Sequence, residues 1–446
     1  MRIIIAGVGD LGFHLAKLLA YEEQDIIVID QDPEVLENAS NNLDVNVIKG
    51  SSTSIKVLEE ANVAKADLLI AVTSNEETNI ATAIIGKSLG AKKTIARISN
   101  IEFLHQRDKL DLKTVGIDEI ISPESLGARE IKRLLKQSAL TDTFEFEKGS
   151  LSLIGITVDE ESELRDKTLT ETAYLNPDHN FTTIAILRDH ETIIPYGDNK
   201  FSMGDHAYFI AEPSGVNRVM SLAGKESIEI KNVMILGGSK VGINLAKQVS
   251  KKYNIKLIEQ DKEKCLALAD ELPDTMIING DGRSIDLLKQ EGIDRMDAFV
   301  ALTGNSETNI ISSLVAKNNG VRKTISAVEN IDYIHLSQSI GVDTLINKKL
   351  IAANFIFRYI RKGHVLNLTS IHGVDAEILE FEVKKGSKMI DHALKELKFP
   401  KQAIIGGVIR NSSGHAVRGD FVFKEKDRVV VLSKSDCIRN VETFFK

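Results

Sequence analysis

The chain opens with Arg2-Ile-Ile-Ile-Ala-Gly-Val-Gly-Asp-Leu-Gly12, a short apolar run followed at once by the pattern GxGxxG. The segment Leu11–Ala20 then has the apolar spacing of an amphipathic helix, and the next apolar run ends at Asp30, 18 residues beyond Gly12. A strand, a glycine turn, a helix and a second strand that ends in an acidic residue form the complete fingerprint of a dinucleotide-binding βαβ unit.

Each part of this fingerprint has a physical role. Gly7 permits a tight turn, Gly9 lets the backbone approach a pyrophosphate, and Gly12 lets the helix pack close to the strand. Free N–H groups at the helix start bind phosphates, and Asp30 accepts hydrogen bonds from a ribose diol, which favours NAD over NADP. The predicted cofactor-binding residues are therefore Gly7, Val8, Gly9, Asp10, Leu11, Gly12 and Asp30. The alternative is a glycine turn that binds no ligand.

Short apolar runs continue through the first 121 residues. They predict strands at Arg2–Ala6, Ile26–Asp30, Val45–Ile48, Asp67–Val72, Thr94–Ile98 and Glu119–Ile121. The runs are continuous rather than alternating, as expected for strands buried on both faces. Helix-length segments separate most of them, and Pro123–Ser138 reads as a further helix with a proline in its first turn. This order predicts an α/β domain with a doubly wound parallel sheet.

Polar residues at the strand ends extend the predicted site, because the carboxyl ends of parallel strands border the ligand crevice. Thr73 and Ser74 are expected to meet phosphates or the nicotinamide-side ribose, or else to form only a polar turn. Arg97 is expected to reach a phosphate, or else to make a surface salt bridge. Ser51–Thr53 lies near the expected adenine side, or caps a helix.

The chain repeats this unit. Ala71-Val-Thr-Ser-Asn-Glu-Glu-Thr-Asn-Ile80 returns as Ala301-Leu-Thr-Gly-Asn-Ser-Glu-Thr-Asn-Ile310, an offset of 230 residues. At that offset, residues 50–100 and 280–330 align without a gap and share 18 identities in 51 positions. A second nucleotide site is therefore predicted at Gly237, Gly238, Ser239, Lys240, Val241 and Glu259.

The second copy departs from the fingerprint. Ser239 replaces the middle glycine, Glu259 takes the place of Asp30 if one residue is deleted before it, and Ala327 replaces Arg97. A Cβ atom then stands where the backbone should approach the pyrophosphate. We expect a dinucleotide to bind here differently or more weakly, and a smaller adenine nucleotide or no ligand remains an alternative.

A smaller, β-rich unit follows each large one. Arg188 with Gly204-Asp205 is matched by Arg410 with Lys426-Asp427, at an offset of 222. Two Rossmann-like doubly wound parallel-sheet domains, each followed by a small α+β domain, are therefore the predicted fold class. The predicted division is residues 1–123 (Rossmann-like), 124–140 (linking helix), 141–226 (small), 230–349 (Rossmann-like), 350–367 (linking helix) and 368–446 (small).

Composition excludes several classes of protein. Lys and Arg number 56 against 64 Asp and Glu, and this acidic balance argues against a nucleic-acid partner. The two cysteines, Cys265 and Cys437, lie far apart, which excludes a disulfide framework and a thiol-rich metal site. Apolar runs fall far short of the ~20 residues of a membrane span. We expect a cytoplasmic protein with reduced thiols and no metal site.

Signatures of catalysis are missing. The ten histidines form no HxxxH or HExxH, and the chain has no GxSxG and no Walker A lysine. A dehydrogenase adds a substrate domain with a positioned acid or base, whereas here each nucleotide unit is followed only by a small one. No catalytic residue is predicted. Nucleotide sites without chemistry indicate sensing, in which a ligand selects among conformations and another protein responds.

The whole pattern resembles the TrkA family, the peripheral nucleotide-binding subunits of Trk potassium uptake systems. The resemblance rests on GVGDLG with Asp30, on AVTSNEETNI and its copy, on ARISN at Ala96–Asn100 and on ISPE at Ile121–Glu124. It implies tandem RCK N- and C-domains in a cytoplasmic ring, peripheral on the inner face of the membrane and docked on a potassium transporter. It also implies NAD or NADH at the fingerprint loop, with ATP or ADP as a further ligand.

Two alternatives stay open at this stage: an NAD-dependent oxidoreductase with an unrecognised substrate site, and the regulatory module of a potassium efflux system. The apolar residues of the two linking helices would be costly to expose together. They are Leu126, Ile131, Leu134, Leu135, Phe355, Ile356 and Tyr359. We therefore expect these helices to cross onto a neighbouring large unit and the chain to be a homo-oligomer, namely a tetramer.

Overall fold

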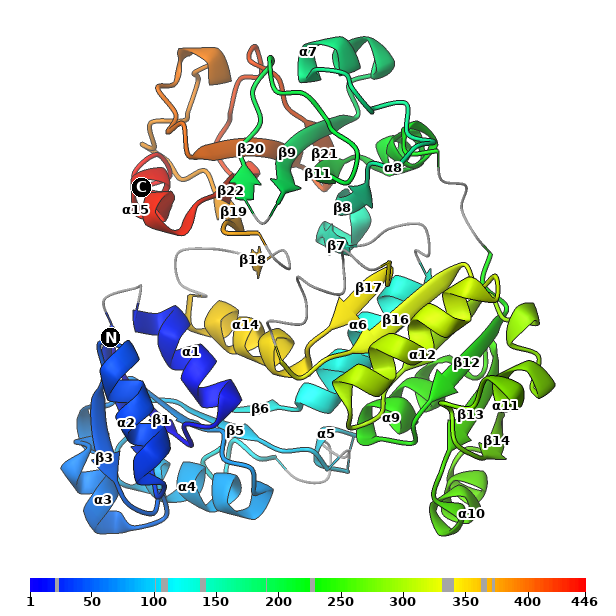
Figure 1. The fold of residues 1–446 in the computed structure, drawn as a ribbon. Helices are drawn as coiled ribbons and strands as arrows, with labels where there is room; N and C mark the ends of the chain where they lie inside the picture. Colours follow the sequence, from blue (N-terminus) through cyan, green and yellow to red (C-terminus); the bar gives the residue numbers. More distant parts are fainter. Residues whose placement is uncertain are drawn as a thin grey trace. The chain divides into compact units, whose positions relative to one another are not determined.

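The computed structural model describes the chain except for residues 21–23, 101, 106–110, 137–141, 190, 225–228, 331–340, 362–366 and 371–373. Two six-stranded and two five-stranded sheets alternate along the sequence (Figure 1). Among the described helices none combines the length and the apolar character that crossing a bilayer requires. The chain forms two compact units, Met1–Arg129 with Asn347–Ile360, and Glu130–Ile346 with Arg361–Lys446.

The first sheet has the strand order β3-β2-β1-β4-β5-β6, and all neighbouring strands are parallel. Its strands are β1 (Arg2–Ala6), β2 (Asp25–Asp30), β3 (Asn46–Lys49), β4 (Leu68–Ala71), β5 (Thr94–Arg97) and β6 (Glu119–Ile121). Its helices are α1 (Asp10–Ala20), α2 (Pro33–Asn42), α3 (Ile55–Glu60), α4 (Glu76–Ser88) and α5 (Glu102–His105), followed by α6 (Pro123–Lys136).

Strand β1 shows why its run of isoleucines is continuous. Ile4 packs in a cluster with Leu58 of α3, and Ile85 of α4 packs against that cluster. Ile3 and Ile5 point to the opposite face and are equally buried. Because both faces are covered from Ile3 to Ala6, this part of the strand has no polar residue, as the sequence predicted.

The second Rossmann-like sheet repeats the order as β14-β13-β12-β15-β16-β17, again all parallel. Its strands are β12 (Asn232–Leu236), β13 (Asn254–Glu259), β14 (Thr275–Asn279), β15 (Ala298–Ala301), β16 (Lys323–Ala327) and β17 (Thr344–Ile346). Its helices are α9 (Lys240–Val249), α10 (Lys262–Glu271), α11 (Ile285–Gln290) and α12 (Ser306–Asn318), followed by α14 (Lys348–Arg361). The doubly wound fold class is thereby confirmed.

The small domains are two antiparallel sheets of the same topology, β10-β9-β11-β8-β7 and β21-β20-β22-β19-β18. The first comprises β7 (Asp142–Phe146), β8 (Leu151–Thr157), β9 (Phe181–Arg188), β10 (Glu191–Ile193) and β11 (His206–Ala211), with α7 (Leu169–Thr172) and α8 (Pro213–Leu222). The second comprises β18 (Asn367–Ser370), β19 (Glu377–Glu382), β20 (Ala403–Arg410), β21 (Ser413–Ala416) and β22 (Arg428–Ser433), with α15 (Ile438–Glu442).

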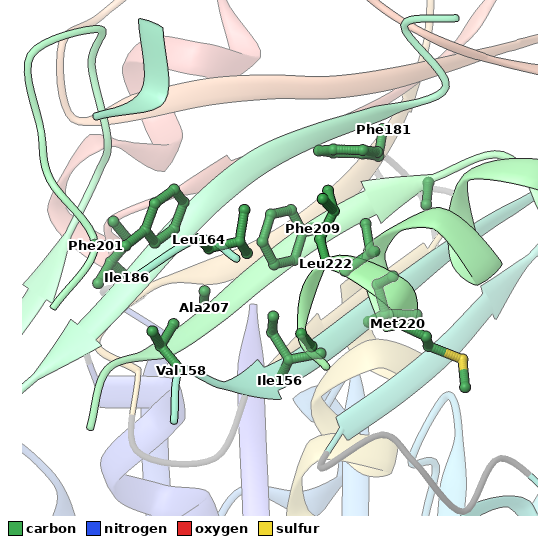
Figure 2. Packing of buried hydrophobic residues seen from close by; sticks show 14 residues of the cluster. Ile156, Val158, Leu164, Phe181, Ile186, Phe201, Ala207, Phe209, Met220 and Leu222 are labelled. Atoms are coloured by element: carbon green, nitrogen blue, oxygen red, sulfur yellow. The ribbon is translucent and has the colours of Figure 1, made fainter. Parts of the chain in front are cut away.

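The first small domain has an aromatic core on one face of its sheet (Figure 2). Phe209 packs edge-on against Phe181 and stacked against Phe201, with ring centroids 5.7 and 6.4 Å apart. On the other face, residues of both small domains share one apolar cluster, in which Ile184 and Ile210 meet Val430. The first small sheet is therefore covered on both faces.

The residues that repeat between the two small domains form an ion pair in each of them. Arg188 contacts Asp205 through Nε and one terminal nitrogen, both at 2.8 Å, and the Asp205 side chain is 1% exposed. Arg410 holds Asp427 in the same way, at 2.8 and 2.7 Å. The hydrogen bonds that Arg188 donates to Asp205 raise the pKa of Arg188. These pairs have a structural role, because removing one partner leaves a buried charge without compensation.

The linking helices differ in part from the prediction. The second begins at Lys348 rather than at residue 350. The end predicted for the first, residue 140, lies outside the described residues, whereas the end predicted for the second is wrong, because Asn367 is the first residue of β18 (Asn367–Ser370). Leu126, Ile131, Leu134 and Leu135 of α6 are buried within the single chain, as is Ile356 of α14. Helix α14 belongs to the compact unit of the first Rossmann-like sheet, although it follows the second in sequence. The apolar faces of these helices therefore do not by themselves require a second chain.

His14 in α1 gives a pH-dependent contribution to stability. Burial, with a smaller contribution from Lys17, lowers the pKa of His14 from 6.5 to about 4. The unfolded chain therefore takes up a proton first, and stability present above pH 6.5 is lost as the pH falls toward 4. We expect His14→Gln to remove about 2 kcal/mol of this loss. The measurement is the free energy of unfolding in urea at pH 7 and pH 4.5. Equal losses in both proteins would contradict the prediction.

Candidate nucleotide-binding site

The carboxyl ends of the first parallel sheet border an open cleft of about 530 Å³. Most of the predicted residues line it: Gly7, Gly9, Asp10, Leu11, Asp30, Thr73, Ser74 and Arg97. Val8 and Gly12 are buried and do not line the cleft. Strand order makes this arrangement, because the crossover between β1 and β4 leaves a crevice where the connections diverge.

The glycine loop has the geometry that its sequence predicts. Gly7 has φ +98°, a conformation that side chains disfavour, and its N–H donates to the Ile29 carbonyl at 2.9 Å. A Cβ atom on Gly12 would lie 1.9 Å from the Gly7 carbonyl oxygen. These two glycines are therefore required by the protein's own backbone.

Gly9 differs from its neighbours. A Cβ atom placed there would have no heavy atom within 4 Å. The unliganded fold therefore does not require glycine at this position. The open space lies at the start of α1, where N–H groups and the helix dipole favour an anion.

Asp30 connects the loop to the end of β2. One carboxylate oxygen accepts the Val8 N–H at 2.7 Å, and the other accepts the N–H groups of Gln31 and Asp32 at 2.7 and 3.1 Å. These three bonds leave acceptor capacity on the carboxylate, because two oxygens offer about four lone-pair positions. The carboxylate is thus fixed in position and still able to accept from a ribose hydroxyl.

The repeated stretch around Thr73 holds the edge of the cleft together. Asn79 is 1% exposed, and its Oδ1 accepts from the Thr73 N–H and hydroxyl at 2.8 and 2.7 Å. Its Nδ2 donates to the carbonyls of Thr73 and Arg97, which joins β4 to β5. Asn75 caps α4 by accepting from the Thr78 N–H at 2.6 Å. The Thr73 hydroxyl is therefore engaged within the loop, while Ser74 is exposed at the cleft.

Arg97 and the serines after β3 are also placed by the structure. Arg97 lines the cleft and lies 3.6 Å from Glu124, whose side chain is 8% exposed. Ser52 lines the cleft and shares a 2.9 Å hydrogen bond with Thr82. The position that caps α3 is Ser54, so the alternative that residues 51–53 cap this helix is wrong.

Two residues at this cleft were missed by sequence reasoning. Asn79 belongs to the repeated motif, and a buried amide that follows a strand end by a fixed spacing could have indicated its role. Lys349 of α14 lines the cleft and lies 2.5 Å from Asp10. The sequence contains no local signal for this contact, because the two residues are 339 positions apart.

The second sheet carries a comparable cleft of about 500 Å³. Gly237, Ser239 and Glu259 line it, whereas Lys240 is exposed and Val241 is buried outside its lining. Gly237 has φ +101°, so the tight turn is kept. Gly238 is buried outside the lining and donates its N–H to Glu259 at 3.0 Å.

Ser239 changes the anion-binding end of this cleft. Its hydroxyl oxygen caps α9 by accepting from the Gly242 N–H at 3.3 Å. A side chain thus occupies a backbone donor at the helix start, whereas Gly9 at the matching position of the first copy has no side chain that could do so.

Glu259 is also engaged more fully than Asp30. It accepts from Gln260, Asp261 and Gly238 N–H groups, and Lys264 Nζ lies 2.6 Å away. Burial alone would raise the pKa of Glu259, but the Lys264 and backbone hydrogen bonds hold this pKa below its ordinary value. A ribose hydroxyl would have to displace the lysine. The second cleft is therefore less suited to a dinucleotide than the first.

Two domain families match the chain. The TrkA-N domain matches residues 3–123 and 233–348, and the TrkA-C domain matches residues 153–224 and 378–446. The chain belongs to the TrkA family. It is 32% identical over 455 residues to the Trk system potassium uptake protein TrkA homolog 1 of Methanosarcina mazei, covering all of both chains. It is 32% identical over 453 residues to TrkA of Haemophilus influenzae, covering 100% of this chain and 99% of the relative.

Solved structures share the fold at low sequence identity. The crystal structure of the GsuK RCK domain gives a TM-score of 0.60 at 16% identity, covering 100% of this chain and 94% of that one. The GsuK channel bound to NAD also gives 0.60 at 16% identity, covering 100% and 78%. This family member therefore has tandem RCK-type architecture, as predicted.

Proposed function

We propose that this protein is a nucleotide-sensing, cytoplasmic, peripheral regulatory subunit that gates a membrane potassium uptake transporter of the Trk type. The observation that carries the proposal is the first cleft, in which a loop open at Gly9 faces the fixed carboxylate of Asp30. NAD or NADH is the ligand that this arrangement fits, because it offers a pyrophosphate to the helix start and a ribose diol to the carboxylate. ATP or ADP is a further ligand.

The comparisons support both parts of this proposal. The full-length relatives are named as proteins of Trk potassium uptake systems. A GsuK channel has been solved with NAD, and a related GsuK structure with ADP gives a TM-score of 0.50 at 15% identity, covering 81% of this chain and 69% of that one. The residues proposed for the first site are Gly7 to Gly12, Asp30, Thr73, Ser74 and Arg97. Those of the second are Gly237 to Val241 and Glu259.

Potassium flux tests the function directly. The transporter is reconstituted in liposomes with and without this protein, and uptake is measured while NADH or ATP is titrated. We expect uptake to depend on both the protein and the nucleotide. If potassium uptake does not change with nucleotide concentration at saturating protein, the proposal is contradicted.

Catalytic oxidation of NADH distinguishes an oxidoreductase from a sensor. Purified protein is incubated with NADH and candidate carbonyl substrates, and NADH absorbance is followed. Substrate-dependent oxidation would contradict the sensor. Co-purification with membrane proteins of the native cell separates uptake from efflux systems by the identity of the transporter.

The ring implied by the family resemblance sets the expected mass in solution. We expect a homotetramer, with a mass four times that of the 49.1 kDa chain. Light scattering at micromolar concentration is the measurement. A monomer would contradict this expectation, and the buried linking helices would then explain how one chain stays soluble alone.

A further inference from the structure

Helix α14 brings a cation to the glycine loop of the first cleft. The chain leaves β17 of the second Rossmann-like domain and enters α14, which belongs to the compact unit of the first domain. Figure 1 shows α14 beside α1. Lys349 Nζ lies 2.5 Å from the Asp10 carboxylate, and both residues line the cleft.

The lysine is held firmly, whereas its partner is not. Asn347 is 1% exposed, and its Oδ1 accepts from the N–H groups of Lys349 and Leu350 at 2.9 and 3.1 Å, which fixes the start of α14. The Lys349 side chain is 22% exposed, while that of Asp10 is 75% exposed. At the far end of the helix, Tyr359 lies under Lys93 Nζ, 5.7 Å from the ring centroid. The helix thus presents Lys349 from a fixed support.

The start of α14 breaks a local rule. The positive end of a helix dipole favours acidic residues, yet the first turn of α14 holds Lys348 and Lys349 and no acid. The corresponding helix α6 begins with Pro123 and Glu124, the usual pattern. A local rule broken without a local gain is typical of a functional position.

The two copies also differ in the charges that they carry at two matching positions. In the first, Arg97 lies beside Glu124. In the second, alanine stands at the arginine position, at Ala327, and lysine at the glutamate position, at Lys349. Lys349 belongs to the second copy in the sequence, but it lines the cleft of the first copy, whose glycine loop is complete.

We propose that Lys349 is a phosphate-binding residue of the first nucleotide site, and that Asp10 holds it in place until the diphosphate of a nucleotide takes over the contact. The proposal rests on the proposed function of that cleft. The ammonium group matches a diphosphate as a point charge with three donors. Helix α14 is followed in the chain by the second small domain. Binding at the first site therefore changes the contacts of a helix that belongs to the second half of the sequence.

Binding of NADH and of ADP, measured by calorimetry, tests the proposal. We expect Lys349→Gln to weaken both ligands roughly tenfold, because a charged hydrogen bond is lost. Lys349→Arg should restore most of the affinity. Lys92→Gln is the matched control, since Lys92 pairs with Asp67 at 2.7 Å on the same unit and outside the cleft lining. It should leave binding unchanged.

The decisive measurement uses the Asp10→Asn background, in which the ion pair is already absent. If Lys349 contacts the phosphates, Lys349→Gln still weakens binding roughly tenfold there. If Lys349 only neutralises Asp10, the second substitution has no effect, and the proposal is wrong. Failure of the wild-type protein to bind either nucleotide would instead contradict the proposed function. Thermal unfolding of each variant confirms that it is folded.

Discussion

Gly9→Val should abolish detectable NADH binding, lowering affinity by at least about 100-fold, or ~2.8 kcal/mol. The reason is that the valine side chain fills the open space in front of α1, where the pyrophosphate must approach the backbone. The same open space means that no part of the protein is displaced, so stability should change by about 0.5 kcal/mol or less. Calorimetry with NADH and urea unfolding measure the two quantities.

Two other glycines make this result specific. Gly12→Ala should also remove binding, but it should cost about 2–4 kcal/mol of stability, because its Cβ atom would meet the Gly7 carbonyl oxygen. Gly304→Val in the second cleft adds a side chain to equally open space and should leave NADH affinity of the first site unchanged. Unchanged affinity in Gly9→Val would show that the loop is only a turn.

Asp30→Ala should weaken NADH binding by roughly 10- to 100-fold and blunt nucleotide control of potassium flux. The carboxylate holds the Val8 N–H and the two amides that follow it, and it has acceptor capacity left for a ribose. Because a ligand shifts a conformational equilibrium only by its differential affinity, a weaker site gives a weaker response. Flux into liposomes that hold the transporter, titrated with NADH and ATP, is the measurement.

Glu259→Ala is the matched substitution in the other half, and it should do less. Glu259 already binds Lys264 at 2.6 Å, and Ser239 already caps the helix that would bind phosphate. Asp30→Asn serves as a second variant, since an amide keeps one acceptor for the loop while losing the charge. Should Glu259→Ala abolish the NADH response and Asp30→Ala leave it intact, the roles assigned to the two clefts would be reversed.

Local sequence patterns were sufficient to predict the fold class. The bounds predicted for β1 and β6 coincide with those of the strands, because the residues of such a strand that are buried on both faces are apolar. The duplication was visible because each copy keeps the same buried amide and cap residues, seen in Asn79 and Asn309. The weak second repeat was visible for a similar reason, since Arg188 and Arg410 each hold a buried aspartate.

The candidate site was predicted where its parts are close in sequence. Gly7, Gly12 and Asp30 act through backbone geometry and hydrogen bonds within one βαβ unit, so spacing alone locates them. Ser239 led us to expect that the second cleft binds a dinucleotide differently or more weakly than the first. The lysine that neutralises Glu259 was not predicted. Lys264 replaces an apolar residue of the first cleft, Val35, and its contact with Glu259 depends on how α10 is oriented against β13.

The sequence by itself therefore determined the doubly wound fold, its duplication and the loop that fits a pyrophosphate, because these depend on patterns within about 30 residues. Tertiary structure alone decided that α14 joins the first Rossmann-like unit, that its apolar face is buried within one chain, and that Lys349 reaches Asp10. Apolar spacing shows that a helix face must be covered, but it carries no information about which surface covers it. A charged side chain carries still less, since its partner is chosen by the path of the whole chain.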